Sequence, residues 1–299
     1  MKVLLTGASG FVGSNIAKVL SDRHGDVVIG TRTDMTDASA VAAHVQRSGA
    51  DAVIHCAILN DWHLMHADRQ LAWNSYVEAT RHYADAAVDA DVPFCLVSTD
   101  WVFDGTQTGA TEDTPPNPIN LYGFLKAASE IVALDRGGSV ARVSGVNGTH
   151  WARPATVRAQ DPGFGYFVAS IVDALEQGQP FTVWEGEELN SIASPSLGAM
   201  CGEVMRAVVG TGSRGIFHCC GSESTTRREL AEATVETFGL DRSLLTFGAA
   251  PPESFAGQRI PHDTSISAVS TSERLGTPLL SVAEILAAFR IERTTGALA

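Results

Sequence analysis

Three residues in the middle of the chain have side chains that together could carry out acid–base chemistry on a carbonyl group. Tyr122 and Lys126 are four positions apart at the start of a segment with a helical pattern, so they lie on one helical face. A phenol with a pKa near ~10 is a poor proton shuttle at neutral pH, and a neighbouring ammonium stabilises the phenolate. Thr99 closes an apolar run upstream, and its hydroxyl could hold a carbonyl oxygen while Tyr122 transfers the proton. The interval Tyr-x-x-x-Lys is common by itself, so the inference depends on the other features of the chain.

The first of these features is a glycine turn near the N-terminus. Gly7, Gly10 and Gly13 follow an apolar strand and precede an amphipathic helix. Glycine permits a tight turn and a close approach of backbone N–H groups to a pyrophosphate, which the helix N-terminus also attracts. A glycine-rich turn without a ligand is the alternative. Its position directly between a strand and a helix favours dinucleotide binding.

The residues after the second strand bear on which dinucleotide is bound. That strand ends at Gly30, and Arg32 comes before Asp34. An acidic residue there would hold a ribose hydroxyl of NAD, whereas a planar guanidinium suits the 2′-phosphate of NADP. We expect NADPH, with NADH possible. Arg32 as an exposed loop residue, with Asp34 at a ribose or adenine edge, is the alternative.

The elements that must position these groups alternate regularly over the first half of the chain. We expect strands at Val3–Thr6, Val27–Gly30, Ala52–Cys56, Phe94–Ser98 and Val140–Val143, and helices at about 11–22, 38–48, 67–90 and 119–134. Such alternation predicts a parallel sheet with helices on both faces, because parallel crossovers are right-handed and cover the sheet. The fold class is therefore α/β, a Rossmann doubly wound parallel sheet.

The rhythm changes in the second half. Residues 147–165 are rich in Gly, Pro and Arg and predict a long loop. After it we expect helices near 166–177 and 196–209, strands at Phe181–Trp184 and Ile216–Cys219, and helices at Thr226–Phe238 and Val282–Phe289. We predict a cofactor-binding domain over 1–146 and a smaller substrate-binding lobe over 147–299, interleaved with strands that return to the sheet. Ligands of open α/β sheets bind over the carboxyl ends of the strands.

Charge and composition narrow the class of partner. The formal net charge is −13, so a nucleic acid or an anionic membrane surface is disfavoured as a partner. No stretch is apolar enough to span a bilayer, and the chain starts directly with a strand rather than a signal peptide. The five cysteines are odd in number and have no Cys-x-x-Cys spacing, so we expect a reducing, cytoplasmic compartment and no metal. The segment His218-Cys219-Cys220 is better interpreted as a buried strand end than as a metal site.

The sequence resembles the extended short-chain dehydrogenase/reductases, and within them the dTDP-4-dehydrorhamnose reductase branch. The block that carries the resemblance most specifically spans 98–130. The matching segments are Thr6-Gly7-Ala8-Ser9-Gly10-Phe11-Val12-Gly13, Asp34-Met35-Thr36-Asp37, Ser98-Thr99-Asp100-Trp101-Val102-Phe103-Asp104-Gly105, Tyr122-Gly123-Phe124-Leu125-Lys126 with Glu130, Arg142-Val143-Ser144, Ser194-Pro195-Ser196, Gly215-Ile216-Phe217-His218 and Arg259-Ile260-Pro261.

The resemblance implies a reductase that transfers a hydride from a nicotinamide to the 4-keto group of a nucleotide-linked deoxysugar. It implies Thr99, Tyr122 and Lys126 as the catalytic group, with Tyr122 as proton donor and Lys126 also on the nicotinamide ribose. Asp100, Trp101 and Arg153 are the expected substrate contacts. A homodimer is possible by analogy. We expect the cofactor to contact Gly7, Ser9, Gly10, Phe11, Val12, Gly13, Arg32, Asp34, Met35, Cys56, Ala57, Tyr122 and Lys126.

Two departures from the family pattern concern the substrate entrance. Trp101 stands where the family usually has a tyrosine, and segment 58–66 replaces an acidic stretch and is shorter. Trp62, His63 and His66 either line the altered pocket or belong to a mobile loop whose aromatic residues pack on its own surface. Arg153 and Arg158 either clamp a substrate diphosphate or are solvated loop charges.

Two other functions remain open from the sequence. The same family includes a cofactor-binding partner of methionine adenosyltransferase, so a non-catalytic regulatory subunit is one alternative; the Thr99, Tyr122 and Lys126 set favours an enzyme. A sugar-nucleotide epimerase or dehydratase is the other. Its oxidising step would favour tightly held NAD, and positions 30 and 31 carry no acid to hold that cofactor.

Overall fold

The computed structural model describes residues 1–30, 33–255 and 257–299. A six-stranded parallel sheet has the order β10-β5-β4-β3-β1-β2. Its strands are β1 Lys2–Thr6, β2 Val27–Gly30, β3 Ala52–His55, β4 Phe94–Thr99, β5 Ser139–Val143 and β10 Gly215–Cys219. The sequence prediction of a Rossmann-type doubly wound sheet is confirmed, and each predicted strand of the first half lies within one residue of its observed bounds.

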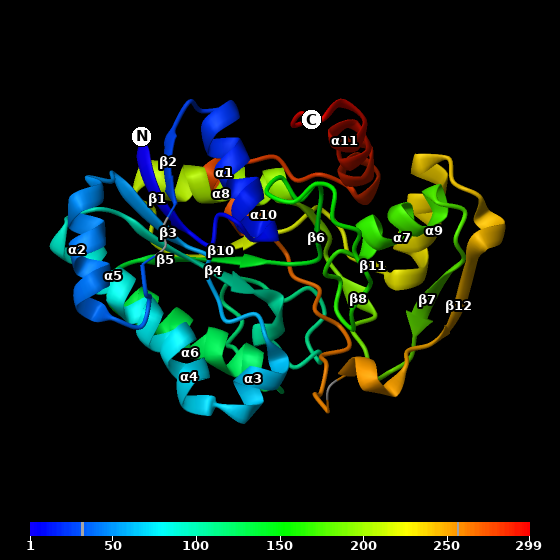
Figure 1. Ribbon diagram of the computed structural model, residues 1–299, viewed down its shortest axis with the longest axis horizontal. Helices are drawn as coiled ribbons and strands as arrows, with labels where there is room; N and C mark the ends of the chain where they lie inside the picture. Colours follow the sequence, from blue (N-terminus) through cyan, green and yellow to red (C-terminus); the bar gives the residue numbers. More distant parts are fainter. Residues whose placement is uncertain (31–32, 256) are drawn as a thin grey trace.

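Helices cover both faces of this sheet (Figure 1). One layer contains α1 Phe11–Asp22 and α8 Gly198–Thr211, which pack against each other; the opposite layer contains α2 Ala38–Ser48, α5 Ala79–Asp89 and α6 Leu121–Asp135. Side chains of a strand alternate between faces. In β1, Val3 and Leu5 therefore join one apolar core, and Leu4 joins the other. A sheet buried on both faces needs such continuous apolar strands.

The predicted helix over 67–90 is observed over residues 69–89, as one helical run with a π-helical turn in its middle. The run consists of α4 Arg69–Trp73, the turn at Asn74–Glu78 and α5, and a short helix, α3 Trp62–Ala67, precedes it. Aspartate side chains set the two helix starts, because Asp61 accepts from the Leu64 N–H at 2.9 Å and Asp68 from the Leu71 N–H at 2.8 Å. Each caps a new helix start. Segment 58–66 is therefore partly helical rather than a loop.

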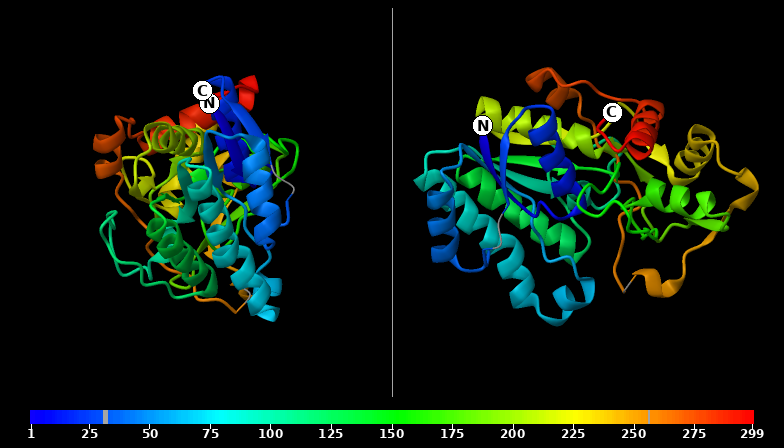
Figure 2. Two further views of the ribbon diagram at one scale, coloured as in Figure 1. Left: turned by 90° about the vertical axis from the view of Figure 1, so that its left-hand side faces the viewer. Right: turned by 45° about the horizontal axis from the view of Figure 1, so that its top comes forward.

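Much of the second half of the chain forms a lobe beside the sheet (Figure 2), while β10 and α8 belong to the sheet and its helical layer. It contains α7 Phe167–Glu176, β7 Phe181–Glu185 and α9 Arg227–Phe238. Strand β12 Leu245–Ala249 pairs in parallel with β7 and was not expected from the sequence; nor were α10 Val269–Leu275 and the extension of α11 Val282–Thr295 to residue 295. Short pairs join β6 Val146–Asn147 to β9 Ser196–Leu197, and β8 Ile192–Ala193 to β11 Thr225–Thr226.

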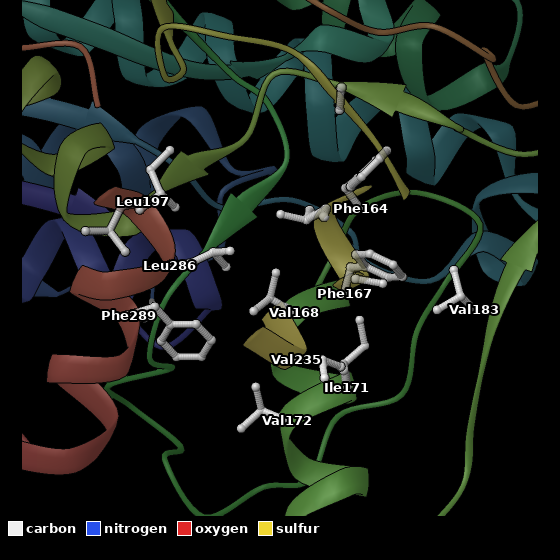
Figure 3. Packing of buried hydrophobic residues seen from close by; sticks show 14 of the residues in the cluster. Phe164, Phe167, Val168, Ile171, Val172, Val183, Leu197, Val235, Leu286 and Phe289 are labelled. Carbon is white, nitrogen blue, oxygen red and sulfur yellow. The ribbon is translucent and has the colours of Figure 1, made fainter. Parts of the chain in front are cut away.

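An apolar core holds the lobe together. Phe167, Val168 and Ile171 of α7 pack with Val235 of α9 and Phe289 of α11 (Figure 3). The predicted long loop is otherwise irregular between β6 and α7. None of the helices in the described ranges is both long and apolar enough to cross a membrane.

Candidate active site

The glycine turn lies between β1 and α1, and two of its three glycines, Gly7 and Gly13, are required by sterics. Gly7 has φ +70°, and a Cβ there would lie 2.8 Å from the Ala57 nitrogen. A Cβ on Gly13 would lie 2.2 Å from the Gly7 carbonyl oxygen, and the Gly10 N–H donates to that same oxygen at 2.9 Å. Gly10 is also the N-cap of α1, and no side chain caps this helix start. The turn therefore presents a helix N-terminus of the kind that binds phosphate.

Thr6 and His55 hold the end of β3 against this turn. Neither residue was predicted from the sequence as part of the site. The Thr6 hydroxyl oxygen accepts from the N–H groups of Cys56 at 3.0 Å and Ala57 at 2.9 Å, and it bonds to His55 Nδ1 at 2.8 Å. Burial, with a smaller effect of the Lys126 charge, lowers the pKa of His55 to about 3, so the imidazole is neutral. The end of β3 is thus fixed against β1. The sequence feature that could have identified Thr6 and His55 is a polar residue at the last position of an apolar strand.

Tyr122 lies in the first turn of α6. Asn120 caps this helix by accepting from the Gly123 N–H at 2.9 Å, and it donates to the Arg259 carbonyl at 3.0 Å. A Cβ on Gly123 would lie 2.2 Å from the Trp101 carbonyl oxygen, so glycine lets α6 approach the end of β4. This close approach brings Tyr122 to the same sheet edge as Thr99.

The hydroxyl of Thr99 is the polar partner of Tyr122. Burial raises the pKa of Tyr122 above its usual value, and hydrogen bonding with Thr99 opposes that rise. Thr99 Oγ1 also donates to Asp100 Oδ1 at 3.0 Å, and Ser144 donates to Asp100 Oδ2 at 2.8 Å. Burial raises the pKa of Asp100 to about 6 against these hydrogen bonds. The spacing of Tyr122 and Lys126 predicts that an ammonium lowers the pKa of Tyr122; in the structure burial raises that pKa, and hydrogen bonding with Thr99 opposes the rise.

Lys126 lies deep behind Tyr122 rather than in solvent. Its Nζ donates to the carbonyl oxygen of Val97 in β4 at 2.7 Å and lies 5.7 Å from the centroid of the Tyr76 ring. Burial lowers the pKa of Lys126 to about 8, while Cys56 and Glu130 act in the opposite direction. At neutral pH the ammonium form still dominates, and it carries donors that the Val97 carbonyl does not use.

A buried ion pair fixes the end of β4 from the other side. Arg142 of β5 donates to both carboxylate oxygens of Glu130, at 2.9 and 2.7 Å, and the two side chains are 0% and 2% exposed. Ser98 also donates to Glu130 Oε1, at 2.5 Å. Such a bidentate pair is geometrically specific. It holds α6, β4 and β5 together directly beneath Thr99.

Thr99, Asp100 and Tyr122 line a cavity of about 300 Å³ between the sheet edge and the lobe. Aromatic rings surround Tyr122: the ring centroids of Trp62, Trp101 and Tyr76 lie 5.8, 6.0 and 6.1 Å from its own. The remaining lining comes from α1, from the loop before α7 and from the segment before α10, and includes Phe11, Val12, Gly163, Phe164, Phe255 and Ile260. The start of α1, Thr99 and Tyr122 therefore open onto one space, whereas Lys126 is not part of its lining.

Several predicted site residues lie elsewhere or have other contacts. Trp62 lines the cavity, whereas His63 is exposed on α3. Met35 packs partly into the sheet core and its carbonyl contacts His82 Nδ1 at 3.1 Å. Asp34 accepts from the backbone and hydroxyl of Thr36, which lowers its pKa. Arg32 lies outside the described residues.

The predicted arginine clamp does not lie at this cavity. Arg153 and Arg158 instead line a second cavity, on the far side of the loop. Among the described residues no group of three or more His, Cys, Asp or Glu side chains is arranged to hold a metal ion. The segment His218-Cys219-Cys220 is buried at the end of β10, where His218 Nδ1 lies 2.9 Å from the Ser267 carbonyl.

Comparison with known proteins agrees with this architecture. The chain is 29% identical over 249 residues to the dTDP-4-dehydrorhamnose reductase of Streptomyces griseus, covering 80% of this chain and 76% of the relative. It is 28% identical over 257 residues to methionine adenosyltransferase 2 subunit beta of Xenopus tropicalis, covering 82% and 74%. The crystal structure of the Bacillus anthracis dTDP-4-dehydrorhamnose reductase in complex with NADP superposes with a TM-score of 0.81 at 22% identity, covering 97% and 99%.

A family model extends the match across almost the whole chain. The model described as the RmlD substrate binding domain covers residues 1–287. The predicted resemblance to the extended short-chain dehydrogenase/reductases is confirmed, and with it the predicted class of enzyme, an oxidoreductase. From the sheet order, the glycine turn and this match, the chain belongs to the RmlD substrate binding domain family.

Proposed function

We propose that this protein is an NADPH-dependent reductase that acts on the keto group of a nucleotide-linked deoxysugar, through Thr99, Tyr122 and Lys126. The observation that carries the proposal is that Tyr122 and Thr99 line the same cavity as Phe11 and Val12, the first residues of α1. The acid–base residues and the phosphate-binding start of α1 thus line the same ligand-binding cavity. The relatives named as reductases of dTDP-linked keto sugars support this substrate class.

The residues present suit a dinucleotide. The glycine cradle leaves no room for a Cβ at Gly7 or Gly13, and α1 begins without a side-chain cap. Gly7, Gly10 and Gly13 would hold the pyrophosphate, and Lys126 would hold the nicotinamide ribose through the donors that Val97 does not use. When bound, the nicotinamide supplies the hydride. A solved relative's complex with NADP and the residue type at position 32 support NADPH over NADH.

The protein's part in the reaction is alignment and proton delivery. The Thr99 hydroxyl holds the carbonyl oxygen, and the Tyr122 hydroxyl donates its proton to that oxygen as the carbon is reduced. The raised pKa of Tyr122 keeps the phenol protonated at neutral pH, which is the form that a proton donor needs. The Lys126 ammonium compensates the charge of the phenolate that remains. Trp62, Trp101 and Tyr76 surround Tyr122 and exclude water from it.

The test is NADPH oxidation by the purified protein with a panel of dTDP-4-keto-6-deoxysugars, repeated with NADH. Tyr122→Phe should lose turnover and keep its affinity for NADPH, and Tyr83→Phe, a phenol in the sheet core, should keep both. Arg32→Ala should reduce the preference for NADPH over NADH. Turnover that Tyr122→Phe retains would contradict the assigned acid.

One observation favours a second candidate, a cofactor-binding regulatory subunit. The chain resembles methionine adenosyltransferase 2 subunit beta about as closely as it resembles the named reductases. The same assay separates the two candidates. Tight NADPH binding with no turnover on any keto sugar would replace the reductase proposal with the regulatory one.

A further inference from the structure

A second cavity, larger than the first, lies between the loop 148–158, α7 and α11. Its volume is about 620 Å³, against about 300 Å³ for the candidate active site. Figure 3 shows α7 and α11 facing each other, with Phe289 toward Val168 and Val172 in the core that underlies this cavity. The volume lies in the range that small-molecule sites have. No function described above uses this cavity.

The loop that covers this cavity is fixed rather than loosely attached. Asn15 of α1 donates to the Thr149 carbonyl at 3.0 Å, and the Trp151 indole donates to Asn15 Oδ1 at 3.2 Å. Lys18 lies over the Trp151 ring at 5.0 Å. At the other end the Arg158 N–H donates to Asp173 of α7 at 3.2 Å. The walls are therefore built by specific contacts from two helices.

The cavity wall contains buried polar atoms that have no partner. His150 is 8% exposed and its Nδ1 has no hydrogen bond among the described residues. Glu292 is 1% exposed; Oε2 accepts from the Thr149 N–H at 3.0 Å, but Oε1 has no partner. The Nε and Nη2 atoms of Arg158 are likewise buried without a partner. Buried polar atoms are normally hydrogen-bonded, so these three groups around one cavity are available to bind a polar ligand.

The charges in the cavity wall favour an anionic ligand. Arg293 pairs with Asp173 at 2.7 Å and with Glu176 at 2.6 Å. Arg153 and Arg158, by contrast, form no ion pair with a carboxylate in the part of the chain that the structure describes. Two uncompensated guanidinium groups stand out in a chain of net charge −13. Burial raises the pKa of Glu292 to about 7, so its carboxyl is partly neutral and can donate a hydrogen bond.

Aromatic contacts give the cavity a flat wall and hold one arginine in place. The Arg158 guanidinium lies 4.6 Å from the centroid of the Tyr166 ring, and that ring is parallel to the His150 ring within 3°. Tyr166 has φ +55°, a left-handed conformation that is unfavourable for a residue other than glycine. The strained backbone thus places the ring that Arg158 needs. Arginine held on an aromatic face presents its planar edge to an oxyanion.

We propose that this cavity is a second ligand site, for a small organic anion whose phosphate or carboxylate group is bound by Arg158 and Arg153. His150 and Glu292 complete the hydrogen bonds of the anion, and Trp151 and Tyr166 contact the body of the ligand. None of these six residues lines the first cavity, and Phe11, which does, packs against the Tyr166 and His150 rings and so lies between the two cavities. The binding proposal therefore does not depend on the proposed reaction.

Isothermal titration calorimetry on the full chain tests the proposal, with inorganic phosphate, citrate and 5′-AMP as probes at constant ionic strength. The titrations are run with and without saturating NADPH, which keeps the probes away from the glycine turn. We expect saturable binding at one site per chain that NADPH does not displace. Arg158→Gln should weaken it about ten- to a hundredfold, and Arg153→Gln less, because charge-assisted hydrogen bonds are lost. Binding of phosphate or of citrate alone would identify which oxyanion the site takes.

The control is Arg47→Gln, which removes an exposed charge on α2 away from the cavity. The unfolding temperature without ligand shows whether each variant is folded. If Arg158→Gln does not fold, Arg153→Gln tests the proposal, because Arg153 is exposed. Equal weakening in Arg47→Gln would mean that general charge attraction was measured. The proposal would be overturned by such equal weakening, by full displacement of the probe by NADPH, or by the absence of saturable binding of any probe.

Discussion

The Nζ atom of Lys126 donates to the carbonyl oxygen of Val97 at 2.7 Å, in the strand that also carries Thr99. The lysine is thereby fixed to β4, and its helix α6 carries Tyr122. Because the strand and the helix are linked at this point, a buried ammonium helps to fix the relative position of Thr99 and Tyr122, together with the Arg142–Glu130 pair. Lysine is usually exposed, but Lys126 is buried here and helps to position the other residues of the site.

Replacement of Lys126 should change the pH dependence of the reaction. The pKa of Lys126 is lowered to about 8, so the ammonium is present below that pH and is lost above it. We expect kcat/KM for carbonyl reduction to fall as the pH rises through about 8. Lys126→Arg keeps a charge at all these pH values, so its residual activity should not show that fall. A profile of the wild type that is flat from pH 6 to 10 would contradict the role of the ammonium.

Tyr122→Phe should reduce kcat by about 10²- to 10⁴-fold, the usual contribution of a positioned proton donor. The ring contacts with Trp62 and Trp101 do not need the hydroxyl, so cofactor and substrate affinities should change little. Steady-state kinetics and fluorescence titration with NADPH measure the two effects separately. A matching rise in the cofactor Kd would show that the hydroxyl serves binding instead.

Trp62→Ala should weaken substrate binding more than it slows the chemical step. The indole lies 5.9 Å from Trp101 and 5.8 Å from Tyr122, measured between ring centroids. An aromatic contact is worth about 0.5–1.5 kcal/mol, so we expect KM for the keto sugar to rise about two- to tenfold. Trp73→Ala, on the neighbouring helix α4 and outside the cavity lining, is the matched control. An unchanged KM in Trp62→Ala would exclude the indole from the substrate site.

Glu130→Gln should strongly destabilise the fold. Its carboxylate is the bidentate partner of the fully buried Arg142, and removal of one member of a buried pair typically costs about 3–5 kcal/mol. The exposed pair Arg228–Glu185 has similar geometry, but a surface pair is worth only about 0–1 kcal/mol. Urea unfolding of Glu130→Gln and Glu185→Gln compares the two. Equal effects would mean that the buried pair does not hold β4, β5 and α6 together.

The carboxyl of Asp100 should make the free energy of unfolding depend on pH. Burial raises its folded-state pKa to about 6 from an ordinary value of 3.8, so the folded protein holds the proton more tightly than the unfolded chain. The stabilisation is fully present below pH 3.8 and is lost as the pH rises through about 6, at no more than about 1.4 kcal/mol per pH unit. Denaturant unfolding from pH 4 to 7 should show that the wild type loses stability relative to Asp100→Asn as the pH rises, because only the wild type must ionise a buried carboxyl. A wild type that gains stability relative to the variant over this range would reverse the assigned sign.

The sequence by itself determined the sheet and the identity of the candidate site residues. Apolar runs such as Leu4-Leu5 and Val53-Ile54 are long enough to be buried on both faces, and parallel strands are the structures that need this. Gly7, Gly10 and Gly13, and the interval from Tyr122 to Lys126, are local patterns that depend only on backbone geometry and helical period. Local patterns of this kind are visible in one dimension.

Only the tertiary structure decided which distant groups meet. Strand β12 has a weak pattern of its own and exists because β7 pairs with it. The pKa of Tyr122 depends on burial against Trp62 and Trp101, which come from other elements. Arg153 was expected at the substrate, yet it lies at a second cavity because a loop has no period that fixes its direction. Burial and long-range contact are properties of the folded chain, so they set the chemistry of residues that the sequence could only nominate.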